Sequence, residues 1–434
     1  MLLQALSQAP VLVKVLATLG LILLANRLLK ELLSSVLIGT AVLGLWFGHG
    51  FPAIGAIAWR RFSEADNLLL AAVLLLVVWL SALMAESGVM GDLVTALRRR
   101  LPHRMALAAL PAVIGFLPMP GGALFSAPML DSCDPERRLS PLLKTQANHW
   151  FRHIWEYWWP LYPGVILCLE LTRLELWRFI AFQLPVTAAA VGIGYLLLLR
   201  RIPVETSRRT EADPPGEARF LGLVAPILAV IGSYALLLLV LPGLQRLSRY
   251  IPMAAGLCLA LIVLQVQRKL PLRAWLKAVL SWQALQIVLL VVVVRIYGAV
   301  IEAPLPGGLL PVEVLRQELA RSGIPEILLV AFLPFVCGFT MGSTVGMVGA
   351  SFPLVLSLLG PQPALGRLLA TAVLAYGFGY MGELLSPVHV CLVLGVQYFR
   401  TRLLRSLLSL VPGVLLVLAV VTLWHLAIIS LLPG

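Results

Sequence analysis

Charge is scarce in this chain. Asp, Glu, Lys and Arg make up 12% of its residues, whereas hydrophobic residues make up 60%. Soluble domains carry about 25% charged residues, so most of this sequence cannot form a surface that faces water. Apolar runs such as 11–29 and 67–85 are long enough to cross a hydrocarbon core of roughly 30 Å as helices. Since no alternating barrel pattern is present, the composition predicts an all-α, polytopic membrane protein.

Cysteine and the common catalytic motifs are also rare or missing. The five cysteines are scattered without a C-x-x-C pair, so the sequence supports neither a disulfide framework nor a zinc site. There is no Walker A loop, no H-E-x-x-H and no nucleophile elbow. The net charge of +13 comes mostly from short loops rather than from a basic face with aromatics. We therefore expect no enzyme activity, no nucleic-acid partner, and no cofactor beyond H⁺ or Na⁺ as a coupling ion.

Apolar length predicts ten membrane-spanning helices, at 11–29, 32–50, 67–86, 145–169, 177–199, 220–241, 251–267, 279–302, 367–396 and 406–431. Two more apolar segments, 105–130 and 326–360, are rich in Gly and Pro. Irregular backbone at membrane depth is tolerated only where it lines a cavity or packs against protein. We therefore expect each of these two segments to be a re-entrant hairpin.

One motif occurs twice in the chain. Residues 102–116 and 325–339 share Pro, Leu-Pro, Val and Gly-Phe at a constant spacing of 223 positions. The spacing then grows to 225 for Ser126 and Ser351, and to 227 for Glu156 and Glu383. Hydrophobic letters repeat by chance, but Pro, Gly and Glu in the same order do not. The chain is therefore predicted to contain two copies of one unit, an architecture typical of transporters.

Loop charges predict how the two copies are oriented. If the segment 105–130 is a re-entrant hairpin, one orientation of the chain places all the basic loops on the cytoplasmic side. These loops contain Arg98 to Arg100, Arg137, Arg200, Arg268 and Arg400. The second hairpin then enters from the outside. Each half has five spans and one hairpin, so the halves are inverted repeats. The predicted units are 1–201, a cytoplasmic linker at 202–219, and 220–434, with broken helices at 145–169 and 367–396.

The hairpin tips combine Gly, Pro and hydroxyl side chains. Gly allows close backbone approach and Pro interrupts a helix, so half-helices end here and expose backbone groups that bind ions. The alternative is tight helix packing through small residues, as between Gly342 and Gly346. The duplication favours a binding site, and the predicted substrate-binding residues of the tips are Pro120, Gly121, Gly122, Ser126, Gly342, Ser343, Thr344 and Ser351.

The span after each hairpin carries a carboxylate just before a helix-breaking proline. Glu156 precedes Pro160, and Glu383 precedes Pro387. A charged carboxyl group at membrane depth costs about 2.5–3.5 kcal/mol, so it normally has a task or a partner. We predict that the coupling ion is handled by Glu156, Glu383, His153 and His389, and that Arg152 faces an anionic substrate. The alternative is a pair between Arg152 and Glu156 that only stabilises the break.

Two further features each have two interpretations. The aromatic residues between positions 150 and 162 form either an interfacial belt or the apolar wall of a substrate cavity. Arg295 follows an apolar run and either contacts the substrate or reaches the interface or a partner, with Glu302 two turns further on.

Two segments, GFLPMPGGALFSAPM and NHWFRHIWEYWWPLYPG, resemble an uncharacterised family of prokaryotic integral membrane proteins. The inverted repeat, the two hairpins and the broken spans are similar to those of the ion transporter superfamily. That superfamily includes the divalent-anion/sodium symporters, citrate and gluconate permeases, and arsenite-type antiporters. The closer resemblance covers most of the chain, whereas the resemblance to the superfamily is architectural.

The resemblance implies a homodimer in the inner (cytoplasmic) membrane of a prokaryote, with a scaffold and a transport domain that slides in an elevator motion. Ser126, Ser343 and Thr344 would then meet the substrate or ion. Sodium/dicarboxylate members carry a Ser-Asn-Thr tip in both hairpins, but neither tip here contains Asn, which argues against sodium coupling and a dicarboxylate substrate. The intramembrane Glu and His residues favour proton coupling instead. We expect a secondary active transporter for a small anionic solute. The alternative is a lipid or amphiphile translocator, and a channel is less favoured because no ring motif is present.

Overall fold

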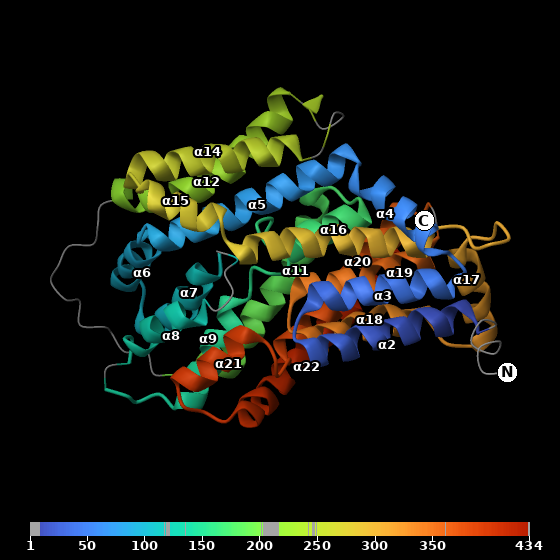
Figure 1. Ribbon diagram of the computed structural model, residues 1–434. Helices are drawn as coiled ribbons and strands as arrows, with labels where there is room; N and C mark the ends of the chain where they lie inside the picture. Colours follow the sequence, from blue (N-terminus) through green and yellow to red (C-terminus); the bar gives the residue numbers. More distant parts are fainter. Residues whose placement is uncertain are drawn as a thin grey trace.

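The computed structural model describes residues 9–116, 118, 122–134, 136–200, 202, 217–241, 243–244, 248, 250–360 and 362–432. The predicted tip residues Pro120 and Gly121 and most of the predicted linker 202–219 lie outside these residues. Within the described part, every regular element is a helix. Figure 1 shows that the first described helix begins and the last described helix ends toward the same end of the molecule.

The first half contains α2 (Val11–Leu29), α3 (Leu32–Trp46), α4 (Phe51–Phe62), α5 (Ala65–Glu86), α6 (Val89–Arg100), α7 (His103–Gly115), α8 (Ala123–Asp131), α9 (Pro141–Arg152), α10 (Pro163–Thr172), α11 (Leu176–Gly194) and the π-helical turn η1 (Tyr195–Leu199). The second half contains α12 (Glu217–Val240), α14 (Ile251–Arg268), α15 (Leu272–Val279), α16 (Trp282–Glu302), α17 (Pro311–Ser322), α18 (Glu326–Met341), α19 (Thr344–Leu359), α20 (Leu365–Leu384), α21 (Val390–Tyr398) and α22 (Leu403–Leu431).

Seven helical segments of the described chain are long and apolar enough to cross a membrane: 11–29, 65–86, 176–199, 221–240, 251–268, 272–302 and 403–431. Seven of the ten predicted spans correspond to them. The predicted span 32–50 is a shorter helix, α3, and the other two are each divided into two helices. The chain is therefore an all-helical, multi-pass membrane protein.

Prolines account for the two divided spans. Helix α9 ends at Arg152 and α10 begins at Pro163, whereas α20 ends at Leu384 and α21 begins at Val390. A proline has no backbone N–H and its ring clashes with the preceding turn. Pro160 lies in the first interruption and Pro387 in the second. Each interruption therefore leaves buried backbone groups that need partners outside a regular helix.

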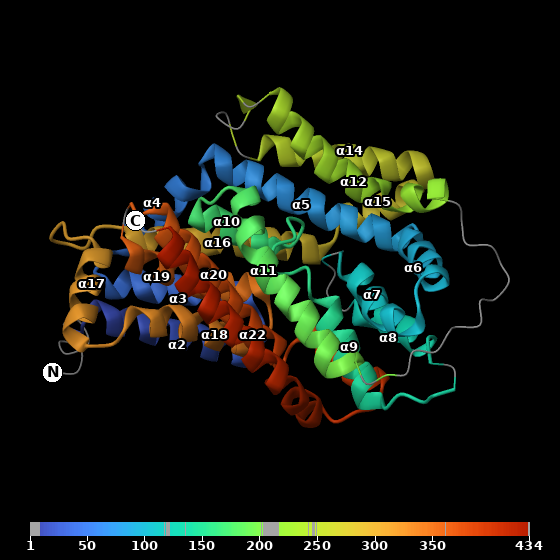
Figure 2. The same cartoon turned by 180° about the vertical axis from the view of Figure 1, so that it is seen from behind.

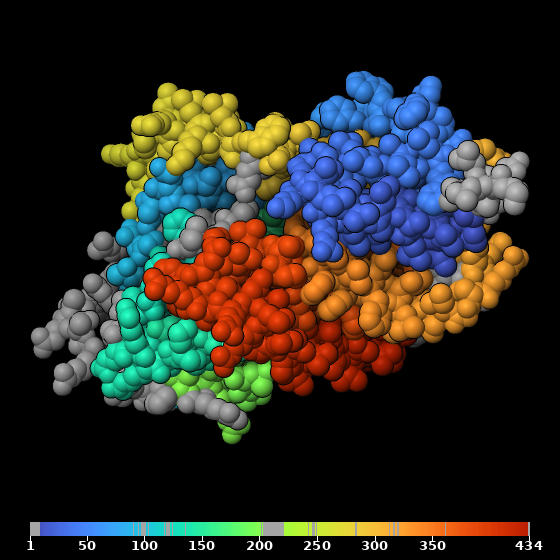
Figure 3. Space-filling view, turned by 60° about the horizontal axis from the view of Figure 1, so that its bottom comes forward, coloured from blue at the N-terminus to red at the C-terminus, as the bar shows by residue number. Residues whose placement is uncertain are grey.

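The Gly/Pro-rich segments form two helical hairpins, α7–α8 and α18–α19. The second arm of each hairpin packs against a half-helix from the other half of the chain: α8 contacts α21, and α19 contacts α10. On the face shown in Figure 3, the segment that contains α8 and α9 lies beside the C-terminal segment that contains α21. Residues far apart in the sequence therefore meet where the hairpins and the interrupted helices come together.

Matching glycines let each hairpin approach its interrupted helix closely. A Cβ atom on Gly115 would overlap the Arg152 carbonyl oxygen, and one on Gly338 would overlap the Gly379 carbonyl oxygen. Gly115 and Gly338 are 223 positions apart, and Arg152 and Gly379 are 227 positions apart. The two copies of the sequence motif therefore make the same backbone contact.

We predict that Gly338→Ala destabilises the protein by about 3 kcal/mol, at the upper end of the usual cost of overpacking. The added methyl group meets backbone on both sides, with the Glu383 nitrogen only 2.9 Å away. Gly192→Ala in α11 is the control, because a Cβ there meets nothing within 4 Å. Thermal unfolding in detergent measures both variants, and equal melting temperatures would contradict the close packing.

A buried ion-pair cluster joins the end of the first hairpin to α9. Lys144 Nζ lies 2.7 Å from a carboxylate oxygen of Asp131 and 2.7 Å from one of Asp134. The side chains of Lys144 and Asp134 are 5% and 4% exposed. Burial alone would raise the pKa of Asp134, but hydrogen bonds from Lys144 and from the Leu139 and Arg138 backbone hold it below its ordinary value of 3.8.

Lys144→Met is expected to lower the free energy of unfolding by about 3 kcal/mol, since it leaves Asp134 buried without its cation. The folded-state pKa of Asp134 is depressed, so the wild-type contribution is complete above pH 3.8 and is lost as the pH falls through the folded-state pKa. Arg138→Met is the control, because the Arg138–Glu136 pair is exposed and contributes about 0–1 kcal/mol. Melting curves at several pH values measure the effect, and equal losses in both variants would exclude a special role for the buried pair.

Candidate functional site

Three histidine rings from the two interrupted helices meet in the interior. His149 and His153 come from α9 and its C-terminal end, and His389 is the residue before α21. They are 2%, 1% and 6% exposed. The rings pack edge to face with centroids 4.8–5.2 Å apart. The closest approach is 3.0 Å, between Nε2 of His153 and Nε2 of His389.

One ring nitrogen of each histidine faces an oxygen acceptor. His149 Nε2 lies 3.0 Å from the Leu384 carbonyl oxygen, and His153 Nδ1 lies 2.5 Å from the His149 carbonyl oxygen. His389 Nδ1 lies 3.2 Å from the Gly342 carbonyl oxygen and 3.4 Å from Glu383 Oε1. Since the acceptors have no proton to donate, each of these nitrogens carries the hydrogen.

Arg152 brings a positive charge to the same place. It is 2% exposed, and its Nη1 lies 3.2 Å from His153 Nε2. A Cβ atom on Gly122, at the tip of the first hairpin, would overlap the guanidinium group. At the tip of the second hairpin, Gly342 has a positive φ of 60° and packs against the His389 backbone. Both hairpin tips therefore converge on the histidine–arginine cluster.

Two buried carboxylates flank this cluster. Glu156 Oε1 lies 3.8 Å from His153 Nε2, and Glu383 Oε1 faces His389. The second oxygen of Glu383 has no hydrogen-bond partner, although the residue is only 2% exposed. An ionised oxygen in this position is costly unless it takes up a proton or a cation. Arg152, His153, Glu156, Glu383 and His389 were all predicted from the sequence, and the structure brings them together.

Aromatic residues of the first interruption cap the end of α7. The Trp155 indole N–H donates to the Ala112 carbonyl at 2.7 Å, Trp159 donates to Phe116 at 3.0 Å, and the Tyr162 hydroxyl donates to Gly115 at 2.5 Å. These acceptors are at the C-terminal end of a helix, where carbonyl groups lack intrahelical partners. Trp159 and Tyr162 are buried. This part of the aromatic cluster is therefore a set of internal hydrogen-bond donors, and not the interfacial belt that was one of its two interpretations.

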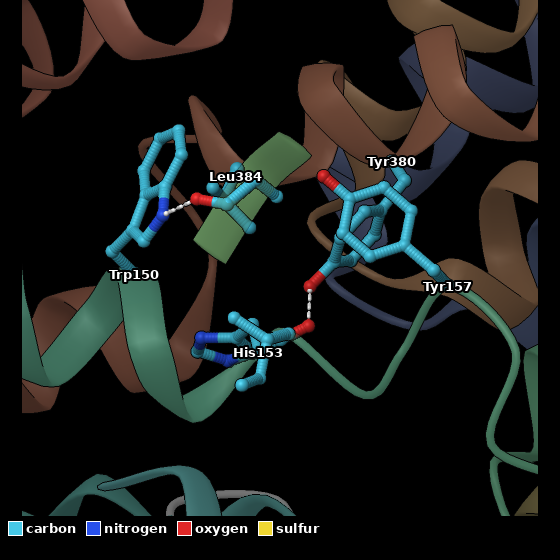
Figure 4. Close-up of a pocket in the computed structure, with 7 residues that line it drawn as sticks. Trp150, His153, Tyr157, Tyr380 and Leu384 are labelled. Atoms are coloured by element: carbon cyan, nitrogen blue, oxygen red, sulfur yellow. Dashed lines mark hydrogen bonds between the residues drawn. The ribbon is translucent and has the colours of Figure 1, made fainter. Parts of the chain in front are cut away.

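Two tyrosines of α20 donate hydrogen bonds to the backbone of the first interruption. Tyr376 donates to the Glu156 carbonyl oxygen at 2.8 Å, and Tyr380 donates to the His153 carbonyl oxygen. Figure 4 shows the Tyr380 bond beside Tyr157 and Trp150. The cavity that these residues line has a volume of about 10 Å³, which is the size of one water molecule. The cluster is therefore closely packed in this conformation.

The hydroxyl groups predicted at the hairpins lie in two different environments. Ser126 and Ser351 are fully buried and donate to the carbonyl groups of Gly122 and Met347 in their own helices. Ser343 instead caps the N-terminus of α19, and a Cβ atom on Gly164 would come within 2.6 Å of Thr344 Cβ. Ser343 and Thr344 therefore lie at the contact of α19 with the N-terminus of α10, whereas Gly342 faces the histidine cluster.

A second group of buried charges lies where α10 meets α5 and α16. Arg295 Nη2 is 2.9 Å from Glu170 Oε1 and 3.3 Å from Glu64 Oε2. Arg295 is therefore paired with acidic partners, which agrees with one of its two interpretations. Its partner is not Glu302, which lies 3.1 Å from Arg61. A cavity of about 290 Å³ adjoins this group, and it is lined by Pro160, Glu170, Arg173, Tyr234, Tyr250 and apolar residues.

The sequence interpretation did not assign His149, Tyr376 and Tyr380 to the site. A signal for them exists, because Glu156 and Glu383 are 227 positions apart and the same spacing pairs His149 with Tyr376 and His153 with Tyr380. Each residue of α20 that supports the first interruption is thus the counterpart of a histidine in α9. The charge of Arg152 has no counterpart, since the same spacing leads to Gly379.

One protein family, described as a protein of unknown function (DUF401), matches residues 12–430 of this chain. The chain belongs to the DUF401 family. This finding agrees with the resemblance to an uncharacterised family of membrane proteins. Membership of the ion transporter superfamily stays a prediction. None of the curated proteins matches this DUF401 chain.

A solved structure, the YdaH transporter of Alcanivorax borkumensis, is similar to the DUF401 chain. The TM-score is 0.54 at 15% sequence identity, and the match covers 85% of this chain and 86% of the other. That structure is described as revealing an unusual topology. At this identity the likeness concerns the fold, and it extends over most of both chains.

Proposed function

We propose that this DUF401 protein is a secondary active transporter that moves a small anionic solute across the cytoplasmic membrane of a prokaryote. The observation that carries the proposal is the burial of Arg152 against Gly122 of the first hairpin tip and beside His153 of the histidine cluster. A guanidinium group is an effective partner for carboxylate or phosphate oxygens. Burial strengthens the attraction between such a group and an anionic ligand, because the interior has a lower effective dielectric constant than water.

Two helix N-termini strengthen the preference for an anion. Helix α8 begins beside Gly122, which contacts Arg152, and α21 begins after His389. These two helices pack against each other. The first backbone N–H groups of a helix carry partial positive charge and lack intrahelical acceptors. Arg152 and the two N-termini together form an environment that favours negative charge.

Glu156 and Glu383 are the proposed coupling groups, together with His153 and His389. The unpartnered oxygen of Glu383 and the short path from Glu383 through His389 to His153 support protons as the coupling ion. Sodium is the alternative coupling ion. In either case the cation compensates a carboxylate that is otherwise costly to bury.

An elevator motion is proposed because the larger cavity is not lined by the residues of the charged cluster. The larger cavity lies between α10 and the α12–α14 pair and reaches Pro160 in the first interruption. Figures 1 and 2 show the α12–α14 pair on one side of the molecule, away from α9 and α21. Movement of the hairpins and interrupted helices past α5, α12, α14 and α16 would connect the cluster with this cavity. A homodimer stays a prediction.

The alternative function is translocation of a lipid or amphiphile. It is favoured by the same cavity, whose lining combines Ile166, Leu169, Leu174, Leu176 and Met253 with a few polar groups. The two functions differ in the solute that responds to an imposed ion gradient.

The carboxylates are tested by uptake into proteoliposomes with an imposed proton or sodium gradient, screened over organic acids and labelled lipids. We expect an organic anion to accumulate, and Glu383→Gln and Glu156→Gln to reduce gradient-driven uptake to the level of empty liposomes. Glu86→Gln is the matched control, because Glu86 is half exposed and pairs with Lys277 at a distance from the cluster. Uptake of labelled lipid alone would favour the alternative function. Normal uptake by both test variants would assign the carboxylates a structural role.

The inverted orientation of the two halves is tested by labelling single cysteines with a membrane-impermeant maleimide. Glu136→Cys, beside the base of the first hairpin, is expected to react only from the cytoplasmic side. Gln362→Cys, beside the base of the second, is expected to react only from the outside. Both positions are exposed, and the background variant lacks the exposed native Cys258. Labelling of both positions from the same side would contradict an inverted repeat.

A further inference from the structure

The three buried histidines are arranged as metal ligands are arranged. In metal sites, a ligating histidine almost always donates its other ring N–H to a carbonyl or carboxylate oxygen, which fixes its tautomer. All three histidines here make such a bond, to the carbonyl oxygens of Leu384, His149 and Gly342, and Glu383 lies beside the third. The nitrogens left with lone pairs are Nδ1 of His149, Nε2 of His153 and Nε2 of His389.

The three histidines form one compact group. One ring nitrogen from each of the three histidines lies within 4.8 Å of those of the other two. The two Nε2 atoms are 3.0 Å apart. A tetrahedral ion with nitrogen ligands at about 2.0–2.1 Å holds those nitrogens about 3.4 Å apart, so small ring movements complete the geometry.

The Nδ1 atom of His149 indicates that the histidine group lacks a binding partner. This atom is buried and has no hydrogen-bond partner. The two Nε2 atoms that face each other also need a proton or another positive centre between them, since neutral imidazoles in this tautomer place two lone pairs in opposition. A single cation that binds all three nitrogens satisfies both requirements.

We propose that His149, His153 and His389 form a binding site for a transition-metal dication of the Zn²⁺ type. Imidazole nitrogens suit Zn²⁺, Co²⁺ and Ni²⁺, whereas Mg²⁺ and Ca²⁺ prefer oxygen ligands. Glu156, whose Oε1 lies 3.8 Å from His153 Nε2, is a carboxylate that can supply a fourth ligand. The proposal does not depend on which solute the protein transports.

Arg152 is the group that opposes the metal. Its Nη1 hydrogen-bonds the same His153 lone pair, and a guanidinium group repels a dication. The metal therefore has to displace this hydrogen bond, while Glu156 and Glu383 supply negative charge beside the site. Removal of the arginine charge is expected to strengthen metal binding, whereas removal of a histidine is expected to weaken it.

The test uses the full-length protein, purified in detergent with an affinity tag that contains no histidine. Titration with Co²⁺ is expected to give saturable, one-to-one binding with the visible absorption of a tetrahedral nitrogen-ligated ion, and Zn²⁺ is expected to displace it. His149→Gln should lower the Co²⁺ affinity at least about 100-fold, because loss of a ligand exceeds the 10–100-fold effect of losing an outer partner. Its amide can keep the donor to Leu384, so folding should be retained, which the melting temperature checks.

Two further variants make the outcome specific. His425→Gln is the matched control, since His425 is buried in α22 and its Nδ1 bonds the Ala370 carbonyl oxygen away from the cluster. It should bind Co²⁺ like the wild type, whereas Arg152→Gln should bind more tightly. Absence of saturable binding, equal loss in His149→Gln and His425→Gln, or unchanged affinity in a folded His149→Gln variant would overturn the proposal. Because binding is measured without transport, failure of the uptake assay leaves this result unaffected.

Discussion

Compensation of buried charge and buried backbone polarity is the constraint on which the structure depends. The interior contains a guanidinium group, two carboxylates and two interrupted helices, and each of these is costly in a medium that excludes water. Glu383 and His389 supply polar groups at one interruption, and Arg152 and Glu156 supply them at the other. The hairpin tips close over this polar centre, so its stability and its chemistry arise from the same contacts.

The two halves of the chain meet this constraint with different side chains. In the first half, indole and phenol groups donate to the end of α7. In the second half, glycines of α18 and α20 allow direct backbone contact, and a Cβ atom on Gly382 would overlap the Phe335 carbonyl oxygen. Only the first copy supplies an arginine. A duplicated framework thus carries a site whose charge is not duplicated.

The architecture could be predicted from the sequence to a large extent because its signals are local. Apolar length locates the spans, and Pro160 and Pro387 mark the interruptions. The same prolines drew attention to Glu156 and Glu383. The contribution of α20 could not be predicted in this way, because Tyr376 and Tyr380 look like ordinary core residues until the fold places their hydroxyl groups on the backbone of the first interruption. The role of Ser126 could not be predicted either, because only the folded structure shows that its hydroxyl group forms a hydrogen bond within its own helix.

The aromatic donors on α7 have a mechanical consequence. Trp155, Trp159 and Tyr162 tie three carbonyl groups at the end of the first hairpin arm to the interrupted segment, so displacement of the arm must carry the segment with it. The glycine contacts impose the same restriction on α18 and α20. In the proposed elevator motion, relative movement would then be concentrated at the surface where Arg295 of α16 meets Glu170 of α10. The rate of such a movement would be governed by the breaking of a buried ion pair rather than by bending of the hairpins.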